Sequence, residues 1–125
     1  MIQSEALFAA LSPLVAGRVW PVMFPQEPDT PPEWPAIRYT PVGGQITPDV
    51  CGSGDGTLDD VRVQIDAVAT TYEGARLLNQ QIRAVLMTFD PPAVADGPPL
   101  FDFDPELRVH RAIQDFTLYP SSASA

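Results

Sequence analysis

The sequence predicts an α+β fold, in which a small mixed, largely antiparallel sheet carries two helices packed on one face. Residues 58–69 alternate apolar and polar side chains with a period of two, which is typical of a strand with one buried face. Residues 72–89 repeat apolar side chains every three or four positions, as a half-buried helix does. Proline makes up 15 of the 125 residues and gathers in 13–48 and 91–105, which excludes central strands and helix interiors there.

The first half of the chain is predicted to hold one helix and two strands. Residues 4–11 form the helix, and Gly17 ends the short turn that follows it. Residues 18–22 form a strand that Pro21 confines to a sheet edge. Residues 36–42 form a longer strand, because their side chains alternate in character.

The second half is predicted to add two strands and the main helix. The strand 58–69 leads into the helix 72–89, which either Thr70 or Thr71 can cap. A short strand follows at 100–103. The predicted order of elements is therefore helix, strand, strand, strand, helix, strand, strand.

The last predicted strand, residues 107–119, changes phase along its length. Its apolar side chains begin on odd positions, at Leu107 and Val109, and end on even ones. We predict a β-bulge near Ile113 and Gln114, because one extra residue would keep both halves facing the same core. The acids between the aromatic residues of 100–104 are interpreted as the wet face of a hairpin whose aromatic side chains face inward.

One domain is expected over residues 1–125. Within it, the glycine-rich segment 43–57 is predicted to be a long flexible loop. Residues 90–99 are predicted to be a proline-rich linker, and residues 121–125 a frayed tail. The segment 23–35 is predicted to be irregular or polyproline-like.

Charge and composition exclude several classes of chemistry. The net charge is −9 and the chain has no lysine, so a Walker A phosphate loop and a lysine Schiff base are both excluded. The negative charge also argues against non-specific binding to nucleic acid. Cys51 is the single cysteine, which permits neither an internal disulfide nor a multi-cysteine zinc site. With no apolar run near membrane length, we expect a soluble protein kept inside the cell.

Candidate catalytic groups are few, and we expect no catalytic, cofactor or metal site. His110 lies in the middle of a predicted strand, and no nucleophile elbow accompanies it. The aspartate-rich run 49–60 does not place oxygen ligands where a calcium-binding loop needs them. A small acidic enzyme or ligand-binding domain that uses His110, the pair Asp102 and Asp104, or the 49–60 run is the alternative reading.

Aromatic residues around the proline-rich segment suggest a contact with another protein. Trp20, Phe24 and Trp34 flank or lie within this segment, where they form either a satellite core or a contact surface. Asp49 and Asp55 lie in the flexible loop, which we expect to order only against a neighbouring molecule. These five residues are the predicted subunit or tail contacts.

Five short sequence patterns, in chain order, resemble those of the tail-completion or tail-terminator proteins of long-tailed (siphovirus-like) bacteriophages and prophages. They are the opening helix 5–11 (EALFAAL), the word GRVWP at 17–21, PAIRY at 35–39, the pattern R-V-Q-I-D-x-x-A-x-x-Y-x-x-A at 62–75 and R-x-x-x-D-F-x-L at 111–118. The segments 43–57 and 90–99 depart most from that pattern.

The resemblance implies a non-enzymatic structural protein that forms a ring, commonly a hexamer, on the finished tail tube. It implies three partners: further copies of the chain, the major tail tube protein and the head connector. It also implies a place at the tail–head junction of the virion, and in the host cytoplasm during assembly. A neighbouring head–tail connector or neck protein is the closest alternative, because related roles reuse small folds. No specific nucleic acid or membrane partner is expected.

Overall fold

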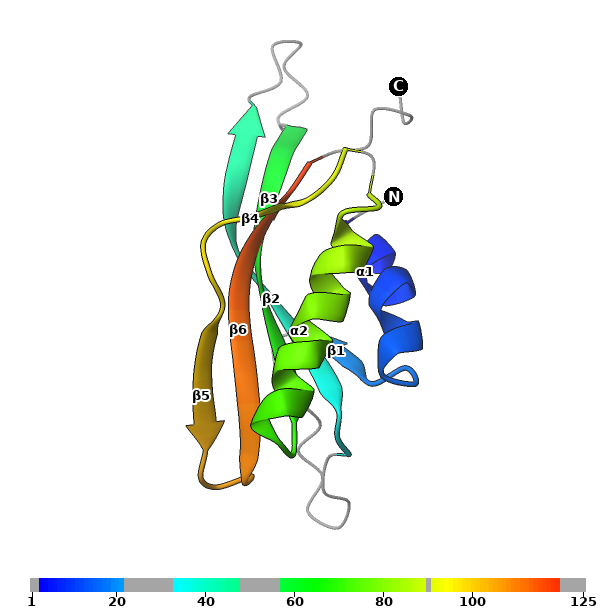
Figure 1. Cartoon of the computed structure of the whole chain (residues 1–125). Helices are drawn as coiled ribbons and strands as arrows, with labels where there is room; N and C mark the ends of the chain where they lie inside the picture. The colour runs from blue at the N-terminus through cyan, green and yellow to red at the C-terminus, as the bar shows by residue number, and fades with distance from the viewer. Residues whose placement is uncertain (1–2, 22–32, 48–56, 90, 120–125) are drawn as a thin grey trace.

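The computed structural model describes residues 3–21, 33–47, 57–89 and 91–119, which form one open sheet with both helices on the same face (Figure 1). The elements are α1 (Gln3–Leu11), the 3-10 turn η1 (Ser12–Leu14), β1 (Val19–Pro21), β2 (Ala36–Thr47), β3 (Thr57–Ala69), α2 (Tyr72–Leu86), β4 (Val94–Ala95), β5 (Leu100–Asp104) and β6 (Val109–Leu118). The predicted α+β class is confirmed. Neither described helix is long and apolar enough to cross a membrane.

The strand order across the sheet is β1-β2-β3-β6-β4, and β5 also pairs with β6. The exclusion of central strands from 13–48 is therefore wrong for β2, which pairs on both sides and holds Pro41 next to a register shift. Only β1 and β2 run parallel, so the sheet is mixed and largely antiparallel, as predicted. The strand β4 was not predicted, because its two residues lie inside the segment expected to be a linker. It pairs with Phe116 and Thr117, while β5 pairs with the first half of β6.

The main core lies between the helices and the sheet. Helix α2 contributes a stripe of buried residues, namely Ala75, Leu78, Asn79, Ile82 and Leu86. Ile65, at the middle of β3, is 1% exposed and faces this stripe. Thr71 rather than Thr70 caps α2, because its hydroxyl oxygen accepts a hydrogen bond from the Gly74 N–H at 3.0 Å. The helix itself ends at Leu86, three residues before the predicted end.

A buried polar chain ties α2 to the far side of β6. The Asn79 amide donates to Oε1 of Gln114 at 3.2 Å, and the Gln114 amide donates to the Gly97 carbonyl at 2.6 Å. Both side chains are almost fully buried, so these bonds offset the cost of placing amides in an apolar core. They hold the segment between β4 and β5 against β6.

The predicted bulge near Ile113 and Gln114 is wrong. The register between β3 and β6 runs without a shift from Val61 opposite Leu118 to Ala69 opposite His110. Val109 is buried on the other, helix-free face of the sheet, in a second cluster with Ala36, Val68, Trp20 and Trp34. The change of phase therefore marks a change of apolar face rather than an inserted residue.

Of the segment predicted as a loop over 43–57, residues 43–47 and 57 continue β2 and β3, and residues 48–56 lie outside the described residues. The two strands stay paired from Gly43 opposite Arg62 to Thr47 opposite Thr57, with register shifts between Pro41 and Gly43 and between Gln45 and Ile46. Ladder hydrogen bonds need no apolar side chains, and bulges let a ribbon twist without losing pairing. We call residues 43–47 and 57–60 the β2–β3 arm, which continues past the end of α2 (Figure 1).

Candidate interaction surfaces

The two described tryptophans of the predicted contact set come together on the helix-free face. Trp20, on β1, and Trp34, just before β2, are both half-buried and pack against Ala36, Val68 and Val109. They thus build a satellite core, and their contact with another protein stays a prediction. The other three predicted contacts, Phe24, Asp49 and Asp55, lie outside the described residues.

The helix-free face centres on a buried carboxylate that sequence reasoning did not single out. Asp66 is 0% exposed, and Arg38 on the neighbouring strand donates a hydrogen bond from Nε to its Oδ2 at 2.9 Å. The second guanidinium nitrogen of Arg38 contacts the same oxygen, and the Gln64 amide donates to Oδ1 at 3.1 Å. Both carboxylate oxygens are therefore satisfied, which makes the group a structural element of the sheet.

Further ion pairs cross the same face from strand to strand. Arg62 lies 3.3 Å from Asp115 and 3.8 Å from Asp96. Arg111 donates to both oxygens of Asp102, at 2.8 and 2.6 Å, and these hydrogen bonds raise the pKa of the Arg111 guanidinium. The pairs form a charged ladder that joins β3, β6 and the edge strands.

The carboxylates considered for acid–base chemistry each have a structural partner. Asp102 is held by Arg111, as described above. Asp104 accepts hydrogen bonds from the backbone N–H groups of Glu106 and Leu107, at 2.9 and 3.2 Å, and so shapes the turn between β5 and β6. The two acids therefore have different structural roles, and their geometry does not pair them around a substrate.

His110 belongs to an aromatic surface at one edge of the sheet. Its ring lies 4.9 Å from that of Phe103 and 6.5 Å from that of Tyr72, and the Tyr72 ring lies 5.1 Å from that of Phe101. We call these four residues the aromatic edge. They come from the start of α2, from β5 and from the start of β6, so no single stretch of sequence announces them.

The aromatic edge is largely exposed, contrary to the inward orientation predicted for the aromatic residues of β5. Tyr72, Phe101 and Phe103 are 48%, 36% and 50% exposed. They lie on the helix side of the sheet, but α2 packs on β3 and β6 and leaves β5 uncovered (Figure 1). An edge strand with exposed apolar side chains is a place where a second protein can pair or pack.

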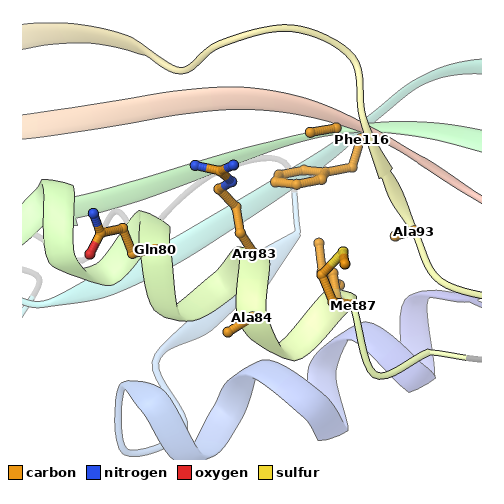
Figure 2. Close-up of a pocket in the computed structure, with 8 residues that line it drawn as sticks. Gln80, Arg83, Ala84, Met87, Ala93 and Phe116 are labelled. Atoms are coloured by element: carbon orange, nitrogen blue, oxygen red, sulfur yellow. The ribbon is translucent and has the colours of Figure 1, made fainter.

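A pocket of about 260 Å³ lies between α2 and the β4–β6 pair (Figure 2). Its apolar wall comes from both layers and consists of Ala84, Leu86, Met87, Ala93, Ala95 and Phe116. Gln80 and Arg83 supply the polar groups, and Figure 2 shows the Arg83 side chain reaching from the helix toward Phe116. The volume is below the roughly 300–1,000 Å³ of small-molecule sites, so it suits one or two side chains of another protein.

The arginines of the described chain divide into paired and unpaired groups. Arg18, Arg38, Arg62, Arg76 and Arg111 each have a carboxylate within 4 Å. Among the residues that the structure describes, Arg83 and Arg108 have no such partner. The described residues also hold no group of three or more side chains that could bind a metal ion.

Together these observations define a small α+β protein with an exposed aromatic edge and a small pocket beside its main helix. A family model described as "Tail completion protein gp17" matches residues 5–119, nearly the whole chain, and the chain belongs to this family of phage tail completion proteins. The resemblance found in the sequence patterns is thereby confirmed. No curated protein sequence matches the chain significantly. Membership assigns the protein a structural role in a bacteriophage tail and hence a place in the virion.

Proposed function

We propose that this protein closes the head-facing end of the tail tube as a homohexameric ring and presents the docking face for the head connector. The family supports the tail role, and the resemblance of the sequence supplies the ring and its six copies. The structural observation that supports association is the aromatic edge, where Phe101 and Phe103 of β5 lie exposed beside the exposed Tyr72 at the start of α2.

A ring requires two different surfaces on each subunit. Contacts that repeat head to tail close into a ring when the rotation between neighbours is a fixed fraction of a full turn. The aromatic edge is one such surface, since burial of its apolar area against a neighbour is favourable at about 25 cal/mol per Å². The major tail tube protein and the head connector then meet the two flat faces of the ring at the tail–head junction. Assembly takes place in the host cytoplasm.

The charge of the chain suits a channel for DNA. With a net charge of −9 and no lysine, a ring of six copies carries a large negative charge. Acids that line the lumen repel the phosphates of the duplex and leave it free to slide. The arginines, which would hold DNA, are mostly engaged with carboxylates in the described part of the chain.

The test mixes the purified protein with tail tubes that lack a terminator and images them by electron microscopy. Six-fold rings at one end of each tube are expected. Protein that binds only empty head portals identifies a connector protein instead, and protein that remains monomeric in both mixtures contradicts both roles.

A paired variant links this assembly to the aromatic edge. Phe101→Ser with Phe103→Ser removes exposed apolar surface, so the monomer is expected to remain folded while ring formation is lost. Leu77→Ser is the matched control, because Leu77 is 46% exposed on α2 and lies outside the aromatic edge. Equal loss of rings in both proteins would show that the aromatic edge has no special part.

A further inference from the structure

The β2–β3 arm is a two-stranded projection with an unusual charge. Residues 43–60 contain four aspartates and no basic residue. A two-stranded ribbon is marginally stable in water by itself and gains stability from packing on another surface. The arm leaves the body of the sheet beyond α2, where no described helix covers it (Figure 1).

The pocket between α2 and β4 is apolar and has a positive charge at its rim, in contrast to the acidic arm. Its wall is apolar, and Arg83, exposed at its rim, has no ion pair among the described residues. In an otherwise acidic protein, an unpaired arginine beside apolar surface favours a partner that carries both an apolar side chain and negative charge. In the arm, Ile46 lies opposite Leu58, and two aspartates follow Leu58 in the sequence.

Another acidic projection fits the pocket less well. The turn between β5 and β6 exposes Glu106 and Leu107, but Arg108 follows directly and cancels the charge of Glu106. By contrast, the sequence from 43 to 60, which covers both strands of the arm and the residues between them, holds four aspartates and no basic residue. Charge complementarity therefore selects the arm.

We infer that the pocket receives the β2–β3 arm of a second copy of this chain, with Arg83 facing its aspartates. This inference rests on the proposed ring and adds the arm and the pocket, as a further pair of surfaces, to the aromatic edge in the contact between neighbouring copies. Each copy then gives its arm to one neighbour and takes the arm of the other. An arm on one copy and a pocket on the next make a contact between unlike surfaces, as a closed ring requires.

A charge-reversal series tests the contact, with ring formation followed by native mass spectrometry and on tail tubes. Arg83→Glu is expected to raise the concentration needed for half-maximal ring formation about tenfold or more, because it sets like charges against each other. Arg108→Glu makes the same change at an exposed arginine outside the pocket and is expected to have no effect. Adding Asp59→Arg and Asp60→Arg to Arg83→Glu is expected to restore the rings.

The outcomes separate this inference from the proposed function. Arg83→Glu protein that forms rings as well as wild type overturns the inference and leaves the ring intact. If Asp59→Arg and Asp60→Arg do not restore the rings that Arg83→Glu disrupts, the arm is not the occupant of the pocket. The same conclusion follows if Arg108→Glu disrupts ring formation as strongly as Arg83→Glu. Wild-type protein that forms no ring, alone or on tubes, contradicts the proposed function itself. Urea unfolding of each variant confirms that it is folded.

A cross-link gives a direct second measurement. Cys51 is the only cysteine and lies in the sequence between the two strands of the arm, while Met87 lines the pocket and is 65% exposed. Met87→Cys protein treated with a short bis-maleimide is expected to give a ladder of covalent oligomers under assembly conditions. Gln81→Cys, at an exposed position on a face of α2 that does not line the pocket, is expected to give none. A ladder equally strong with Gln81→Cys, or a link formed only within one chain, overturns the inference.

Discussion

Arg38 lies directly opposite Asp66 in the β2–β3 ladder and donates a hydrogen bond to its carboxylate at 2.9 Å. Asp66 is completely buried, while the Arg38 side chain is 24% exposed. The arginine thus lies between a buried charge and water. An ion pair of this kind contributes little compared with a well-packed apolar pair, but removal of one partner leaves the other charge stranded.

Arg38→Met is expected to lower the free energy of unfolding by about 3 kcal/mol, because Asp66 then lacks its cation in a buried site. The partial exposure of Arg38 places this value at the low end for a buried pair. Replacing both partners, as Arg38→Met with Asp66→Leu, is expected to recover most of the loss. Urea unfolding at neutral pH measures both. A double variant no more stable than Arg38→Met would contradict the stranded-charge explanation.

The order of elements and the main core can be predicted from local sequence patterns. Which face of the sheet buries a given strand residue cannot be predicted in this way. The alternation around Ile65 and the stripe of α2 each repeat within one segment, so both were predicted correctly. Val109 was misassigned because its burial depends on Trp20 and Trp34, which are more than 70 positions away in the sequence. A single strand pattern shows which residues share a face, but not whether the opposite face has a cover.

The candidate surfaces were harder to predict for the same reason. Phe101 and Phe103 are exposed because α2 does not extend over β5. The sequence of β5 itself does not show how far a helix elsewhere in the chain covers the sheet. The pocket gathers residues from α2, the following segment, β4 and β6. The glycine-rich part of the β2–β3 arm has no periodic apolar pattern, and the backbone pairing of two strands leaves no such pattern in the sequence.

Thr71→Ala is expected to lower the free energy of unfolding by about 1 kcal/mol, since the Gly74 N–H loses its capping oxygen. Thr70→Ala is the matched control. Thr70 is exposed, directly precedes the cap and makes no described bond to the helix, so its loss should have little effect. Thermal unfolding followed by circular dichroism compares the two. Equal effects of the two substitutions would mean that the cap contributes nothing specific.

The pair Glu73 and Arg76 at the start of α2 gives a pH prediction. The hydrogen bond from Nε of Arg76 to the Glu73 carboxylate, at 3.2 Å, holds the pKa of Glu73 below its ordinary value. A carboxylate with a lowered pKa in the folded state stabilises the fold above its ordinary pKa, and this contribution is lost as the pH falls through the folded value. The first turn of α2 should therefore loosen on acidification.

Arg76→Gln is expected to return the pKa of Glu73 toward its ordinary value, as followed by an NMR titration of its side-chain carboxyl carbon. The effect on overall stability is expected to be small, because the pair lies at the surface, where the side chains of Arg76 and Glu73 are 36% and 60% exposed. Arg83→Gln on the same helix serves as the control and should not move the pKa of Glu73. An unchanged titration in the Arg76→Gln protein would exclude the arginine as the cause.

Ile65→Asp is expected to abolish folding. Ile65 lies at the centre of β3, faces α2 and is 1% exposed, and the register gives it Tyr39 and Gln114 as its cross-strand neighbours. A carboxylate there has no arginine on the same face to pair with among the described core residues, so it costs several kcal/mol, comparable to the roughly 5–15 kcal/mol of a whole domain. Ile65→Val, which removes one methylene from the same site, is expected to cost only about 1 kcal/mol. Circular dichroism and urea unfolding distinguish the two variants, and a folded, stable Ile65→Asp protein would show that the inner face of β3 is wrongly assigned.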